Sequence, residues 1–190
     1  MTWNEIVSAI CIWLSAALFS LSLQGQTKLK ILFVQFFATL LYLLNYLFVI
    51  TSIPTAKIGA ITASFEILRL FVFYFIEKSK KYNTKTWNLV AAIAFSIILT
   101  VCTILSSNSW YGIFPLVAAI LVSLALGNKN VILIKIAFII QAACIVTYLL
   151  LLGLVANAIS QMIVFVFGIV GLITLILKTK KEKPVENSQN

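Results

Sequence analysis

The segment from Ala56 to Ile76 reads AKIGAITASFEILRLFVFYFI and has the length of a membrane-spanning helix, since about 20 apolar residues cross a bilayer core of about 30 Å. Within it, Glu66 and Arg69 are the only charged residues deep inside an apolar segment of this chain. Residues at i and i+3 share one helix face. A lone charge at the bilayer centre costs roughly 2.5–3.5 kcal/mol. We therefore predict a transmembrane helix whose two charges face protein and neutralise each other.

The composition agrees with a membrane protein. The chain has 190 residues, of which 62% are hydrophobic and 10% are charged, and its mean hydropathy is +1.10. Soluble domains average about 25% charged residues. The net charge is +9, but the basic residues lie between apolar segments and form no soluble basic face. We expect the lipid bilayer as a partner and no nucleic acid.

The residue inventory disfavours catalysis. The chain has no histidine, which removes imidazole metal sites and histidine-dependent nucleophiles. Its three cysteines, Cys11, Cys102 and Cys144, fall in different apolar segments without CxxC spacing, as expected of small apolar residues in a core. We predict that the protein is not an enzyme and binds neither a metal nor a cofactor.

Seven apolar runs are long enough to be spans, and the first lacks the positive charge that precedes a cleaved signal sequence. The predicted fold class is therefore an all-α membrane protein with seven transmembrane helices, at residues 4–23, 31–50, 56–76, 88–106, 110–126, 131–152 and 156–177.

Lysine placement predicts the orientation of these spans. Alternating the spans puts twelve of the fourteen basic residues on one side, while Lys57 alone lies on the other and Arg69 is intramembrane. Because basic residues concentrate on the cytoplasmic side, we predict an external N-terminus and a cytoplasmic C-terminus.

Two parts of the chain are weakly alike. Residues 18–25 read LFSLSLQG and residues 121–127 read LVSLALG, and each is followed by a helix with one central glutamine, Gln35 or Gln141. This similarity predicts two parallel three-helix repeats joined by the fourth helix, related by an axis along the membrane normal. The predicted units are residues 1–83, a connector helix at 84–107, residues 108–177, and a basic cytoplasmic tail at 178–190.

Helical periodicity gathers polar residues into stripes that face protein. One interpretation is a polar site at the membrane midplane that binds a small polar solute or relays a proton. The other is interhelical hydrogen bonding, which membrane helices use routinely. The candidate site residues are Glu66, Arg69, Gln35, Tyr42, Asn45, Gln141, Tyr148 and Gln161.

Three runs resemble the YgjV family of bacterial inner-membrane proteins: LSLQGQTKLKILFVQFFATLLYLLNYLFV, GAITASFEILRLFVF and FPLVAAILVSLALGNKN. The best single mark is the arginine of the third helix, matched here by Arg69. Where the family tends to have asparagine three residues earlier, this chain has Glu66, and its last helix is more apolar, with Gly168 and Gly171. The resemblance implies a multi-pass protein of the bacterial inner membrane with a SWEET-like 3+1+3 helix arrangement, and implies no particular activity.

Two functions remain open at this point. The first is a small-solute transporter with a midplane site. The second is a non-transporting membrane partner or regulatory subunit in which the charge pair is structural. A solvent-accessible cavity bordered by Glu66, Arg69, Tyr42 and Gln161 favours the first function, whereas a sealed core in which the two charges satisfy each other favours the second.

Overall fold

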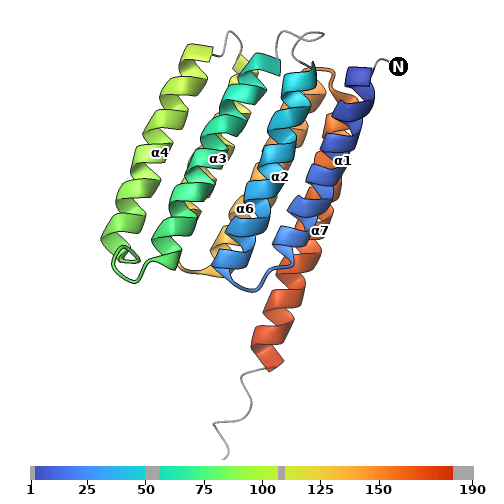
Figure 1. Cartoon of the computed structure of the whole chain (residues 1–190). Helices are drawn as coiled ribbons and strands as arrows, with labels where there is room; N and C mark the ends of the chain where they lie inside the picture. Colours follow the sequence, from blue (N-terminus) through green and yellow to red (C-terminus); the bar gives the residue numbers. More distant parts are fainter. Residues whose placement is uncertain (1–2, 50–55, 107–109, 182–190) are drawn as a thin grey trace, which may run out of the picture.

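The computed structural model describes residues 3–49, 56–106 and 110–181, and these residues are helical throughout apart from short turns (Figure 1). A short 3-10 helix, η1 (Trp110–Gly112), leads directly into the fifth α-helix. The α-helices are α1 (Trp3–Leu23), α2 (Lys28–Val49), α3 (Ala56–Lys78), α4 (Lys85–Ser106), α5 (Ile113–Leu126), α6 (Val131–Leu151) and α7 (Val155–Lys181). The predicted all-α class is confirmed for these residues.

Six of the described helices, all except α5, are long and apolar enough to cross a membrane. The helix in the fifth predicted span is shorter than the other six. α5 itself has 14 residues, and it covers Trp110–Leu126 only together with η1. At 1.5 Å per residue, the 14 residues of α5 cover about 21 Å, less than a bilayer core of about 30 Å. Large apolar side chains such as Ile97, Leu105 and Val166 lie on the outer surface. These features fit a multi-pass membrane protein.

The helices pack in chain order around a closed ring. Each helix from α1 to α6 packs against the next one along the chain, and α7 closes the ring by packing against α1. Helices that follow one another along the chain run antiparallel, whereas α1 and α7, which both run from the upper to the lower end in Figure 1, are parallel. The ring leaves an interior toward which polar side chains of several helices can point.

Helix α4 contacts both α3 and α5, so it is a member of the ring as well as the link between the two predicted three-helix units. The ring contacts do not test whether α1–α3 superpose on α5–α7. The repeat, and the unit boundaries derived from it, stay predictions.

The lower end of the ring carries the turns after α1, α3 and α5 and the end of α7, which are the lysine-rich parts of the chain (Figure 1). Here Lys28 of α2 is 4% exposed, and its Nζ lies 3.2 Å from Glu77 Oε2 of α3. The contact with Glu77 is an ion pair without hydrogen-bond geometry, whereas Lys28 donates a hydrogen bond to Asn88 Oδ1 of α4 at 3.2 Å. This polar cluster ties three helices together at the lysine-rich end.

The contact between α1 and α7 depends on a glycine. A Cβ atom on Gly171 would meet the carbonyl oxygen of Leu23, so the α1 backbone approaches α7 at this point more closely than a side chain allows. Beside it, Gln24 Nε2 donates to the Phe167 carbonyl at 3.0 Å, and Lys135 Nζ of α6 donates to the Gly171 carbonyl at 3.0 Å. Gly171 therefore lets α7 close the ring.

We expect Gly171→Ala to lower the melting temperature of the detergent-purified protein by several degrees, because the clash is with backbone that cannot rotate away. Gly168→Ala on the same helix is the matched control. Its Cβ would meet side-chain atoms of Ile139 and Leu23, which can move. Equal melting temperatures for the two variants would show that the ring does not depend on this close approach.

Candidate functional site

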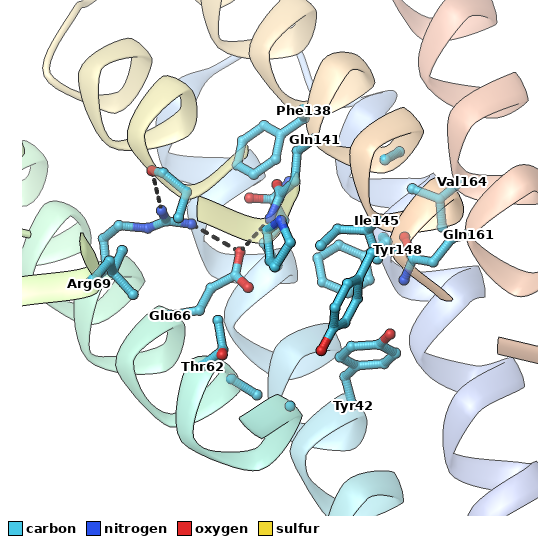
Figure 2. Close-up of a pocket in the computed structure, with 18 of the residues that line it drawn as sticks. Tyr42, Thr62, Glu66, Arg69, Phe138, Gln141, Ile145, Tyr148, Gln161 and Val164 are labelled. Carbon is cyan, nitrogen blue, oxygen red and sulfur yellow. Dashed lines mark hydrogen bonds and ion pairs between the residues drawn. The ribbon is translucent and has the colours of Figure 1, made fainter. Parts of the chain in front are cut away.

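The ring encloses a cavity of about 80 Å³, several times the roughly 10–15 Å³ that one water molecule needs. Side chains from all seven helices line it (Figure 2). Glu66 and Arg69 lie near the middle of α3, so the cavity is at mid-depth in the ring. Its polar lining consists of Gln35, Tyr42, Tyr46, Thr62, Glu66, Arg69, Gln141, Tyr148 and Gln161.

Glu66 and Arg69 form the predicted ion pair. Arg69 Nη2 donates to Glu66 Oε1 at 2.9 Å, and the arginine side chain is 1% exposed against 15% for the glutamate. The i, i+3 spacing places both on the inner face of α3, while Leu68, Phe71 and Phe75 are exposed on its outer face. The prediction that the two charges face protein and neutralise each other is confirmed.

Arg69 also reaches across the ring to α5. Its Nη1 donates to the Ala119 carbonyl at 3.1 Å and to Ser123 Oγ at 3.2 Å. Ser123 Oγ in turn donates to the same Ala119 carbonyl at 2.8 Å. Both terminal nitrogens of the guanidinium are thus engaged, and Arg69 holds α3 against α5.

The Glu66 carboxylate uses its two oxygens differently. Oε1 accepts both from Arg69 and from Gln141 Nε2 of α6, the latter at 3.2 Å. Among the described residues, no hydrogen bond to Oε2 is found. The carboxylate therefore joins α3 to α6 through Oε1, while Oε2 is not used in this contact.

Gln35 has no hydrogen-bond partner among the described residues. Its side chain is 0% exposed and lines the cavity, yet neither Nε2 nor Oε1 forms a hydrogen bond within the described residues. An unsatisfied buried polar group costs about 1–3 kcal/mol, and native proteins contain few of them. An amide left in this state inside a cavity indicates a site for a polar ligand or for water.

Tyrosines from two helices border the cavity. Tyr46 Oη donates to Tyr42 Oη at 3.1 Å, and their ring centroids lie 4.8 Å apart at 75°. Gly59 of α3 leaves room for the Tyr46 ring, because a Cβ atom at this position would clash with it. Tyr148 of α6 points toward the same space as Tyr42 in Figure 2. Gln161 of α7 completes this part of the lining, beside the Tyr42 hydroxyl.

Asn45 alone among the eight candidate residues does not line the cavity. Its Oδ1 accepts from Ser8 Oγ of α1 at 2.7 Å, and both side chains are buried. The structure thus places Asn45 in the packing between α1 and α2, as its position at the edge of the α2 polar face allows.

The structure also brings in residues that the periodicity of single helices does not identify. Ser123 and the Ala119 carbonyl bind Arg69 although α5 carries no polar stripe. The one local signal was the serine within the LVSLALG run. In the part of the chain that the structure describes, no three His, Cys, Asp or Glu side chains come together in a way that would hold a metal ion.

No protein-family model, curated protein or solved structure matches this chain, so its function is argued from the fold and the cavity.

Proposed function

We propose that this protein is a small-solute carrier of a cell membrane and that the cavity is its solute-binding site. The observation that carries the proposal is the mid-depth cavity whose lining includes Gln35, a fully buried amide with no hydrogen-bond partner in the described part of the chain. A ring held together by packing alone would place an apolar side chain there, because a buried unsatisfied amide is destabilising. Polar solutes need such groups, since they must replace the hydrogen bonds lost with water.

The two residues of the ion pair have different roles. Arg69 has three protein acceptors and holds α3 against α5. These contacts support the alternative function, a non-transporting partner or regulatory subunit with a structural charge pair. Glu66 Oε2 and Gln35 have no part in that packing, and they favour the carrier.

The lining of the cavity differs between its two ends. Toward the lysine-rich end, the lining is apolar, with Phe19, Leu23 and Phe138, and the cluster around Lys28 lies at that end of the ring. Tyr46 and Gly59 line the cavity toward the other end. We propose that solute enters past the tyrosines and leaves when the lysine-rich end opens, as in carriers that expose one site alternately to each side.

The orientation that goes with this proposal has the lysine-rich end in the cytoplasm, by the excess of basic residues there. In a variant without native cysteines, we expect Asn4→Cys to react with an impermeant maleimide added to intact cells. Asn128→Cys should react only after the membrane is permeabilised. Asn4 and Asn128 are exposed at opposite ends of the ring. Labelling of both from the same side would contradict the topology.

The carrier proposal is tested by ligand-induced stabilisation. Purified protein in neutral detergent is heated with solutes of different charge classes at millimolar concentration. A ligand that binds only the folded state stabilises it by RT ln(1 + [L]/Kd), about 2.7 kcal/mol at a concentration of 100 Kd. We expect at least one class to raise the melting temperature in a saturable manner, and that solute to accumulate in proteoliposomes. Absence of stabilisation by every class would contradict the proposal.

A further inference from the structure

We propose that the cavity takes a small organic monocation, with its ammonium group held by Glu66 Oε2 and enclosed by the rings of Tyr42, Tyr46 and Tyr148. This inference rests on the solute site proposed above and adds the chemical class of the solute.

The ion pair presents its negative end to the cavity. Arg69 and Gln141 both donate to Oε1 of Glu66, so Oε2 is left to accept from a ligand. In Figure 2, Glu66 lies between Arg69 on one side and Tyr42 and Tyr148 on the other. A cation beside Oε2 thus meets the carboxylate before the guanidinium.

An anion would find little to bind. Arg69 is the one cationic side chain among the described lining residues. Both of its terminal nitrogens are bonded to Glu66, Ala119 and Ser123, which leaves only the single Nε–H without an acceptor among the described residues. A phosphate or carboxylate binds through free guanidinium or ammonium donors. The amides near Glu66 carry no charge that would attract an anion: Gln141 Nε2 already donates to the carboxylate, and Gln35 offers an acceptor, Oε1, as well as a donor, Nε2.

The aromatic residues suit an ammonium group. A cation within about 6 Å of a tyrosine ring is attracted to the face of the ring, most strongly when water is excluded. Tyr42 and Tyr46 stand edge to face at 75°, which leaves ring surface uncovered by their own contact. Both line the same cavity as the Glu66 carboxylate. With Tyr148 they form a carboxylate-and-tyrosine box, and a volume of about 80 Å³ limits its occupant to a compact amine.

The test uses tetramethylammonium and ethanolamine as cationic probes, acetate as the anion and glycerol as the neutral solute, each against sodium chloride of equal ionic strength. Melting temperature and calorimetric titration of the purified full chain are measured. We expect both cations to stabilise the protein saturably, and acetate and glycerol to leave it unchanged.

Two matched pairs of variants locate the cation. Tyr148→Leu should weaken cation binding about tenfold, whereas Tyr148→Phe keeps the ring and should stay within about twofold. Glu66→Gln should abolish binding, whereas Glu5→Gln, which removes a carboxylate outside the cavity lining, should not. The tyrosine pair remains informative if Glu66→Gln is too unstable to purify.

The outcomes separate this inference from the carrier proposal. Binding of acetate or glycerol but of neither cation would overturn the inference and leave the carrier standing. Equal losses in Tyr148→Leu and Tyr148→Phe would overturn the ring-face contact. Stabilisation by no probe and no other solute would overturn both proposals.

Discussion

Glu66→Ala is expected to be among the most destabilising single changes in this protein, at about 3–5 kcal/mol, the usual loss when one partner of a buried ion pair is removed. It would leave Arg69, which is 1% exposed, without a counter-ion. Arginine stays charged at any workable pH. Its remaining acceptors, the Ala119 carbonyl and Ser123 Oγ, are neutral. Unfolding of the purified variant in mixed micelles, followed by circular dichroism, measures the loss.

A double variant separates the structural role of the pair from its binding role. Glu66→Gln with Arg69→Met removes both charges at similar side-chain volume, and replacing a buried pair in this way is often neutral or stabilising. We expect the double variant to recover most of the stability lost by Glu66→Gln alone, while solute-induced stabilisation stays absent. Retained solute binding would show that the pair is a clamp and no part of the site. A double variant as unstable as the single one would refute mutual neutralisation as the reason for the pair.

Gln35→Leu is expected to do the opposite of most core substitutions and to stabilise the empty protein by about 1–3 kcal/mol, because it removes a buried amide that no group of the described residues satisfies. The same change should abolish solute-induced stabilisation, since the amide then no longer reaches the ligand. Melting temperatures with and without solute give both quantities in one experiment.

Gln141→Leu is the matched control for this prediction. Gln141 lines the same cavity, but its Nε2 donates to Glu66 Oε1 at 3.2 Å. Its removal takes a hydrogen bond from a partly buried carboxylate, so the variant should be less stable than the wild type. If Gln35→Leu raises the stability and Gln141→Leu lowers it, the result would support a ligand-binding role for Gln35. A destabilised Gln35→Leu would mean that its amide has a structural partner, and would remove the main support for the carrier.

The helices and the alternating direction of consecutive helices could be predicted from the sequence, because they depend on properties of short segments. A run of apolar residues such as 88–106 has to form a helix in a bilayer, where every backbone amide must find its partner within the segment. The pairing of Glu66 with Arg69 is equally local, since three residues along a helix bring two side chains together. The shortness of α5 was already visible in its predicted span of 110–126.

Contacts between helices were decided by the tertiary structure alone. Arg69 meets Ala119 and Ser123 because α3 and α5 face each other across the ring, and no periodicity within one helix encodes that distance. Asn45 shares a helix with Gln35 and Tyr42, yet it turns to Ser8 of α1 and leaves the cavity lining. The sequence by itself determined which helix faces are polar. The packing of seven helices into a closed ring determined which polar groups satisfy one another and which, like Gln35, have no partner among the described residues, because that outcome depends on the positions of all neighbouring helices at once.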